Sequence, residues 1–320
     1  MIHLPPFAAT VTIASLYGVL FLSTLIILLL KRMRPEVDFS EVTTRTNSWW
    51  VMITIFSLAV ILERGAAIIF LGFISFLAFK EYLSLIPTRR ADHRILLWAY
   101  LSIPLQFFWV YNYWYGMFIV FIPVWIFLLL PMRMVTIGAT EGFLRAAGTL
   151  HWGLMITVFN LSHAAYLLSL PQIDNPMAGS VGLLLFLVIL TQFNDVAQYV
   201  WGKSLGRRKI VPAVSPKKTW EGFLGGVATT AVVGFFLAPY LTPLEGWHSL
   251  IAGAIIAASG FVGDVIVSAV KRDLGVKDCS NLIPGHGGIL DRVDSLTVSA
   301  PVFFHYIFYL YTGPRLESLL

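Results

Sequence analysis

The stretch SAVKRDLGVKDCSNLIPGHGGILDRVD, residues 268–294, begins at the end of one long apolar segment and leads into the next. It holds four basic side chains, four aspartates and a histidine in a Pro-Gly-His-Gly-Gly turn. Asp291 and Asp294 are three residues apart, so both carboxylates lie on one face of a helical turn, with Arg292 between them. Mg²⁺ prefers one or two carboxylates together with substrate phosphates. The pair therefore predicts a metal site.

Positive charge and exposed backbone accompany this pair of carboxylates. Lys271, Arg272 and Lys277 supply the cations. Glycine lets the backbone approach a phosphate closely, and the glycines in question are Gly285, Gly287 and Gly288. Metal, cations and glycines together predict a phosphate-binding site.

Apolar segments make up most of the remaining chain. Apolar residues are 58% of the sequence and charged residues 12%, with a mean hydropathy of +0.79, a composition typical of a polytopic membrane protein. We expect an all-α fold with about ten transmembrane helices. The candidate segments are 8–30, 49–62, 65–80, 95–111, 114–130, 150–170, 178–194, 222–240, 249–270 and 296–312.

The distribution of basic residues predicts the topology, because Lys and Arg favour the cytoplasmic side of short loops. If the loop after segment 8–30 is inside, twenty of the 22 Lys and Arg residues fall in inside segments, Arg89 and Arg90 among them. Only Arg64 and Arg315 are then outside, and both termini are outside as well. The first segment has no basic region before it, so we expect a retained helix rather than a cleaved signal peptide.

One part of this topology stays open. Residues 31–48 are expected to form a charged inside loop, and the segment that follows, 49–62, is short for a span. Residues 49–80 therefore form either two full spans or a re-entrant hairpin.

The formal net charge of +5 and the pI near 9.3 follow from these inside loops. We expect partners among membrane lipids and anionic substrates, and no nucleic acid. The single Cys279 excludes an internal disulfide and is expected to be structural or incidental rather than a nucleophile.

Ionisable groups are concentrated toward the C-terminus. We expect residues 1–177 to form transmembrane scaffold and lipid contact, and residues 178–320 to form the catalytic region of the same membrane domain, with inside loops 195–221 and 271–294. Asp195, at the inner end of segment 178–194, either caps a helix or belongs to the site.

A second motif, VSPKKTWEG, precedes the segment at 222–240. Lysines and a hydroxyl at a helix N-terminus are suited to phosphate oxygens, and these residues are Ser215, Lys217, Lys218 and Thr219. Positive-inside topology alone also explains the lysines.

Asp264 lies in the middle third of segment 249–270, where an unpaired carboxylate is costly. About one helical turn later comes Ser268, followed by the basic pair that opens the inside loop. The helix therefore directs Asp264 toward Asp291 and Asp294, as a third carboxylate of one metal site.

These motifs resemble the signatures of the CTP-dependent phosphatidate cytidylyltransferases, also called CDP-diglyceride synthases. The first signature matches at Ser268, Lys271, Arg272, Lys277, Asp278, Ser280, Pro284, His286, Gly287, Gly288, Asp291, Arg292 and Asp294. The family's Ser-Pro-x-Lys-Thr-x-Glu-Gly matches at Ser215, Pro216, Lys218, Thr219, Glu221 and Gly222. The N-terminal half resembles the family only as a set of hydrophobic helices.

The chain departs from the family at one motif. Members commonly read Asp-Thr-x-Ala-Tyr after the seventh segment, whereas here Asp195 is followed by Val196, and Gln198 replaces a small residue. Tyr199 and Gly202 stay in register. The departure concerns the nucleotide or lipid pocket and leaves the metal carboxylates unchanged.

The resemblance implies that the phosphate of phosphatidic acid attacks the α-phosphorus of CTP, yielding CDP-diacylglycerol and pyrophosphate. We expect one or two Mg²⁺ ions, for which Mn²⁺ could substitute, bound by Asp264, Asp291 and Asp294. The expected catalytic residues are Lys271, Arg272, His286 and Asp195. The expected substrate-binding residues are Ser215, Lys217, Lys218, Thr219, Ser268, Lys277, Gly287, Gly288 and Arg292. A lipid phosphate is already ionised at neutral pH, so His286 is expected to donate a hydrogen bond to phosphate or to organise its loop rather than to act as a base.

We expect the protein in the bacterial inner membrane, with the active site facing the cytoplasm. The resemblance also implies a homodimer, for which the sequence contains no interface motif. Two other functions fit part of the sequence. A CTP-dependent lipid kinase, or a cytidylyltransferase acting on another lipid, would share the metal and triphosphate features. A transporter would explain the helices and Asp264 but not the stretch at 268–294.

Overall fold

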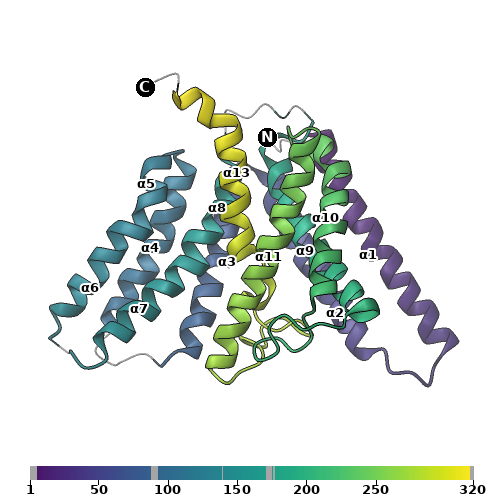
Figure 1. Ribbon diagram of the computed structural model, residues 1–320, viewed down its shortest axis with the longest axis horizontal. Coiled ribbons are helices and arrows are strands. Elements are labelled where there is room, and N and C mark those ends of the chain that lie inside the picture. Colours follow the sequence, from purple (N-terminus) through teal and green to yellow (C-terminus); the bar gives the residue numbers. More distant parts are fainter. Residues whose placement is uncertain (1–5, 88–92, 139, 171–174, 176, 318–320) are drawn as a thin grey trace.

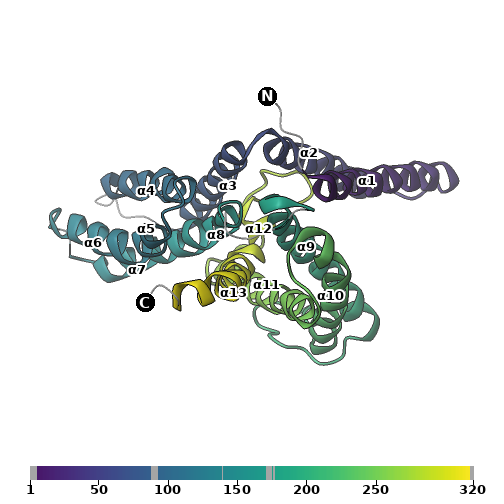
Figure 2. The same ribbon diagram turned by 90° about the horizontal axis from the view of Figure 1, so that it is seen from above.

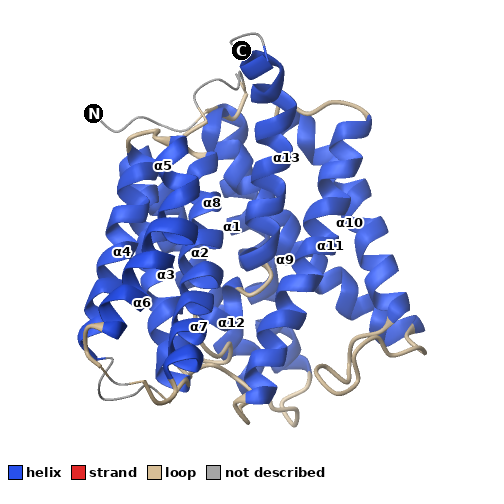
Figure 3. Cartoon of the chain, turned by 60° about the vertical axis from the view of Figure 1, so that its left-hand side comes forward, coloured by secondary structure: helices blue, strands red, loops and turns tan. Residues whose placement is uncertain are grey.

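The computed structural model describes residues 6–317 except 88–92, 139, 171–174 and 176, with side chains through residue 311. The described residues form helices joined by loops and contain no β-strand (Figure 3). The predicted all-α fold is therefore confirmed.

The N-terminal helices are α1 (Phe7–Met33), α2 (Ser40–Leu62), α3 (Arg64–Leu85), α4 (His93–Tyr111), α5 (Tyr115–Val120), α6 (Phe127–Val135), α7 (Phe143–Leu154) and α8 (Asn160–Leu167). Two π-helical turns, Phe121–Ile126 and Met155–Phe159, connect α5 to α6 and α7 to α8. The C-terminal helices are α9 (Gly179–Leu205), α10 (Trp220–Leu241), α11 (Trp247–Asp273), α12 (Leu290–Val293) and α13 (Leu296–Glu317).

Eight helical segments among the described residues are long and apolar enough to cross a membrane. Of the ten predicted spans, α4 and the α7–α8 segment are not in this set. Both carry polar groups, including Gln106 in α4 and His163 in α8. The count of ten spans and the outside position of the termini stay predictions. Arg89 and Arg90, which the topology prediction used, lie outside the described residues, as does the side chain of Arg315.

Residues 49–80 belong to two full-length helices, because α2 has 23 residues and α3 has 22. The expectation of a loop through residue 48 was wrong, since α2 begins at Ser40. The additional turns are polar and are stabilised by an ion pair between Glu41 and Arg45, 2.5 Å apart and one helical turn from each other. Apolar segments alone therefore underestimated the length of this helix.

Helices α9, α10, α11 and α13 pack together beside α12, whereas α3 to α8 form an arm on the other side (Figures 1 and 2). Asn194 of α9 is fully buried and joins three helices of this group. Its Nδ2 donates to the carbonyl oxygen of Ala257 in α11 at 3.1 Å, and its Oδ1 accepts from Thr230 Oγ1 in α10 at 3.4 Å. A satisfied amide of this kind suits a helix interface inside a membrane.

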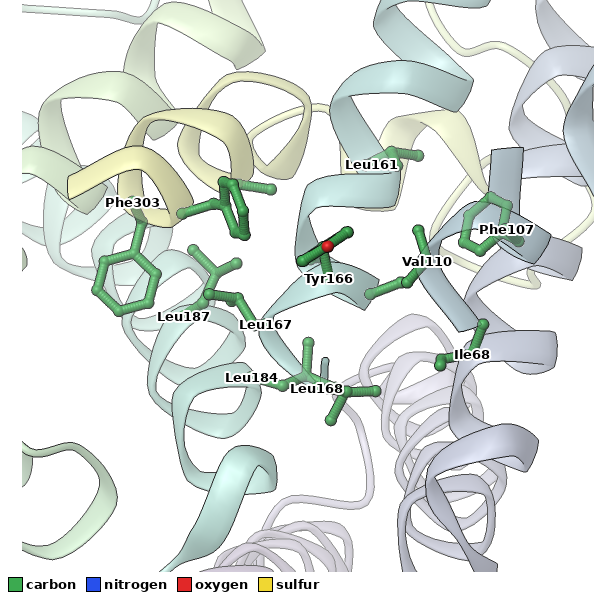
Figure 4. Close-up of a cluster of buried hydrophobic side chains, with 14 of the residues drawn as sticks. Ile68, Phe107, Val110, Leu161, Tyr166, Leu167, Leu168, Leu184, Leu187 and Phe303 are labelled. Atoms are coloured by element: carbon green, nitrogen blue, oxygen red, sulfur yellow. The ribbon is translucent and has the colours of Figure 1, made fainter. Parts of the chain in front are cut away.

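Helix α8 lies between the two groups and gives them a common core (Figure 4). Tyr166 and Leu167 of α8 belong to the same buried cluster as Leu184 of α9 and Phe303 of α13. The loops that join α9 to α10 and α11 to α12 emerge at the same end of this core (Figure 1). That end carries the polar motifs.

Candidate active site

A cavity of about 650 Å³ opens where the C-terminal ends of α9 and α11 and the N-terminal end of α10 meet α12. Most of its lining residues are charged. The lining residues are Gln192, Asp195, Gln198, Tyr199, Gly202, Lys203, Lys209, Ser215, Lys217, Lys218, Thr219, Gly222, Phe223, Asp264, Lys271, Asp278, Asp291, Arg292 and Asp294.

The cavity brings together ten of the sixteen residues predicted for the site. They are Asp195, Ser215, Lys217, Lys218, Thr219, Asp264, Lys271, Asp291, Arg292 and Asp294. Six predicted residues do not line it: Ser268, Arg272, Lys277, His286, Gly287 and Gly288.

Lys218 and Asp264 form one of two lysine–carboxylate pairs at the cavity. Lys218 Nζ lies 2.5 Å from Asp264 Oδ2, and both side chains are about four-fifths buried. The ammonium also donates to Gln198 Oε1 at 3.4 Å, and Ser268 Oγ donates to Asp264 Oδ1 at 3.2 Å. Asp264 thus has the cationic partner that its depth in α11 requires.

The second pair anchors the loop between α11 and α12. Lys271 Nζ donates to Asp291 Oδ1 at 2.8 Å. The other oxygen of Asp291 accepts the backbone N–H groups of Cys279 at 2.7 Å and Gly288 at 2.9 Å. Gly287 has φ +81°, and a Cβ there would lie 2.8 Å from Asp291 Oδ2. Glycine is needed at this position for its backbone conformation and for space.

Asp195 and Asp294 line the same cavity as Asp264. Asp195, Asp264 and Asp294 are close enough to interact electrostatically. Ser295 Oγ donates to both oxygens of Asp195 at 3.3 Å, and Ser295 N donates to Asp294 Oδ1 at 2.8 Å. The result is a cluster of carboxyl groups beside the two lysines.

The donor chemistry of these carboxylates fits Mg²⁺, which is bound by oxygen ligands. Among the residues that the structure describes, however, no three His, Cys, Asp or Glu side chains converge as a ready metal-binding group. The lysine ammoniums occupy oxygens of Asp264 and Asp291. A carboxylate offers about four acceptor positions, so Asp291 retains one beyond its three hydrogen bonds.

His286 faces α2 instead of the cavity. Its ring packs edge to face against Trp49, with centroids 5.8 Å apart. Burial, with the charges of Arg292 and Arg45, lowers the pKa of His286, so the imidazole is neutral at pH 7. At this position the ring contacts α2 and does not line the cavity. Burial also raises the pKa of the Cys279 thiol, which disfavours the reactive thiolate.

Arg272 points away from its neighbour Lys271. Its Nε donates to the carbonyl oxygen of Val214 at 3.2 Å and its Nη1 to that of Val276 at 3.0 Å. Arg272 therefore joins the α9–α10 loop to the α11–α12 loop. Lys277 is exposed.

The structure adds Glu81 of α3, which the sequence analysis assigned to scaffold. Its carboxylate is 7% exposed and accepts three hydrogen bonds from residues 280–290. Next to Lys80 at the end of an apolar segment, such a residue looks like an ordinary solvated helix end. The sequence contained no local signal for this contact.

The chain is similar in sequence to a known family and to several curated proteins. Residues 43–310 match the cytidylyltransferase family. The uncharacterised protein YnbB of Escherichia coli (strain K12) is 46% identical over 298 residues, which are 93% of this chain and 98% of YnbB.

Two proteins with a named activity match over a shorter region. The phosphatidate cytidylyltransferase of Haemophilus influenzae is 42% identical over 133 residues, 40% of this chain and 46% of that protein. The phosphatidate cytidylyltransferase of Brucella suis biovar 1 is 36% identical over 147 residues, 46% of this chain and 54% of that protein. The chain thus matches about half the length of these two relatives. Because the family match extends over most of the chain, the protein belongs to the cytidylyltransferase family and is a nucleotidyltransferase of the membrane.

Proposed function

We propose that the protein is a Mg²⁺-dependent phosphatidate cytidylyltransferase. An oxygen of the lipid phosphate attacks the α-phosphorus of CTP, and the bond from that phosphorus to the oxygen bridging the β-phosphate breaks. Pyrophosphate leaves with the electron pair, and CDP-diacylglycerol stays in the membrane. The observation that carries the proposal is the shared cavity, because both stretches that resemble the family line it with cations and carboxylates.

The cationic side chains address the main physical difficulty, which is that both reacting phosphates are anionic. Lys217 and Lys218 come from the loop before α10, and Lys271 and Arg292 come from α11 and α12. Together they would bind phosphate oxygens and stabilise the charge that develops on pyrophosphate. A phosphate entering the cavity would compete with Asp264 for the ammonium of Lys218.

We propose that Asp264, Asp291 and Asp294 hold one or two Mg²⁺ ions, with Mn²⁺ as a substitute. Bound Mg²⁺ would neutralise phosphate charge and favour in-line displacement. Asp195 lies close enough to Asp264 and Asp294 to add to the negative potential that attracts the cation.

The proposed orientation places the inside loops in the cytoplasm of a bacterium, beneath its inner membrane. CTP would then enter from water, and phosphatidic acid from the adjacent leaflet. Support comes from the basic residues of the loops. The family resemblance alone supports a homodimer.

The test is product formation by purified protein in detergent with CTP, phosphatidic acid and Mg²⁺. We expect CDP-diacylglycerol from the parent and none from Asp264→Asn or Asp291→Asn. Asp273→Asn, an exposed aspartate at the end of α11, is the matched control and should stay active. A parent that consumes no CTP with phosphatidic acid would contradict the substrate assignment, and active Asp264 and Asp291 variants would contradict the metal site.

A second candidate is cytidylyl transfer to a different lipid phosphate. It is favoured by Gln198, which lines the cavity where the family usually has a small residue. The same assay with a polyprenyl phosphate as acceptor, followed by mass spectrometry of the lipid product, separates the two candidates.

A further inference from the structure

The loop between α11 and α12 donates hydrogen bonds to a carboxylate of the N-terminal half. Glu81 of α3 lies about 200 positions away in the sequence but accepts Ser280 Oγ at 2.7 Å and Ile289 N at 2.9 Å on Oε1. Its Oε2 accepts Leu290 N at 2.8 Å. No lysine or arginine among the described residues forms an ion pair with Glu81. The charge of this buried group is therefore stabilised by the loop itself.

These hydrogen bonds act where α12 begins. The first N–H groups of a helix have no partner within the helix, and Glu81 satisfies those of Ile289 and Leu290 from another helix. The next residue is Asp291, whose own carboxylate binds Cys279 N and Gly288 N. Glu81 and Asp291 thus each accept hydrogen bonds from both ends of this loop. A displacement at Leu290 would move Asp291 with it.

Helix α2 contacts the same loop from a second direction. Ser48 Oγ donates to the carbonyl oxygen of Pro284 at 2.7 Å, and Trp49 packs on His286. A side chain at Gly288 would clash with Glu81, because a Cβ there would lie 2.8 Å from Oε1 of Glu81. Both helices α2 and α3 therefore pack against the loop. Glu81 accepts three of the four hydrogen bonds described here between these helices and the loop.

We propose that Glu81 is a positioning residue of the nucleotidyl transfer, which holds α12 so that Asp291, Arg292 and Asp294 face the cavity. The inference rests on the proposed function, because it assigns Glu81 to the reaction of that site. Under this proposal, α2 and α3 position residues of the active site in addition to forming scaffold and lipid contacts.

The chain contains its own reporter of this loop. Cys279 is the single cysteine, is 4% exposed, and precedes Ser280, which binds Glu81. We expect maleimide to alkylate Cys279 in folded Glu81→Ala about tenfold faster than in the parent, because the loop opens more often. Glu81→Gln keeps one acceptor oxygen and should give an intermediate rate. Lys80→Gln, exposed on the neighbouring position of α3, should match the parent.

Kinetics provide the second measurement. At saturating substrates and Mg²⁺, kcat of Glu81→Ala and Glu81→Gln should fall by about tenfold or more. KM for CTP should rise by a smaller factor than kcat falls, because Lys218, one of the proposed phosphate ligands, is held by Asp264 and Gln198 and not by this loop.

The proposal is overturned if Cys279 of both Glu81 variants reacts within about twofold of the parent rate, or if kcat is unchanged. It is also overturned if KM for CTP rises as much as kcat falls, since that shows general disorder of the site. Should Glu81→Ala not fold, Glu81→Gln decides. A parent that makes no CDP-diacylglycerol refutes the proposed function instead, and the alkylation rates still test the contact.

Discussion

Replacing Asp291 by asparagine tests whether this carboxylate supports the fold as well as the reaction. The parent carboxylate accepts Lys271 Nζ, Cys279 N and Gly288 N, and its side chain is 3% exposed. Asparagine offers one oxygen in place of two. It can serve the two backbone donors, but its NH₂ group then faces the ammonium of Lys271.

The expected loss of stability follows from the buried charge that remains. Removing one partner of a buried ion pair typically costs about 3 to 5 kcal/mol. Asp294 is close enough to Lys271 to compensate part of the loss, so we expect the lower end, about 3 kcal/mol. For a chain of 320 residues this lowers the apparent Tm by roughly 5 °C.

The assay is thermal unfolding in detergent, followed by tryptophan fluorescence, beside the exposed control Asp273→Asn. The control should change stability by less than about 0.5 kcal/mol. The double variant Lys271→Met, Asp291→Asn should regain part of the stability, because no charge is left without a partner. Unchanged Tm in Asp291→Asn, or a double variant no more stable than Asp291→Asn, would refute the structural role of the pair.

Three more outcomes are expected. Lys271→Gln should lower kcat by more than about a hundredfold and Arg272→Gln by less than about tenfold, because only Lys271 lines the cavity; the reverse order would show that Arg272 contacts the phosphates. Adding Mg²⁺ should raise the Tm of the parent but not of Asp264→Asn, since a ligand stabilises the state that binds it, and equal shifts would place the cation elsewhere. The lowered pKa of His286 means that its contribution to stability is present above the unfolded-state value of about 6.5 and is lost as pH falls through the folded pKa. The Tm of the parent should therefore fall more between about pH 7 and pH 5 than that of His286→Phe, and parallel curves would contradict this assignment.

Much of the site could be predicted because its chemistry is local in sequence. Asp291 and Asp294 share a face through the three-residue spacing, and both line the cavity. The spacing could not separate Lys271 from Arg272, which are adjacent. Successive residues of a helix point about 100° apart, so one of the two faces the cavity and the other faces solvent. Packing of α11 against its neighbours sets that rotation.

The sequence by itself determined the class of the protein, its helical membrane segments and the signature residues, because hydropathy and motif spacing depend on residues close together in the chain. Only the tertiary structure determined which side chains contact each other across long distances in the sequence. Lys218 pairs with Asp264 across 46 positions, and Glu81 binds Leu290 N across 209. Such contacts depend on how the helices cross, and a lone Glu81 at the end of an apolar segment has no local pattern that distinguishes a solvated charge from a buried one.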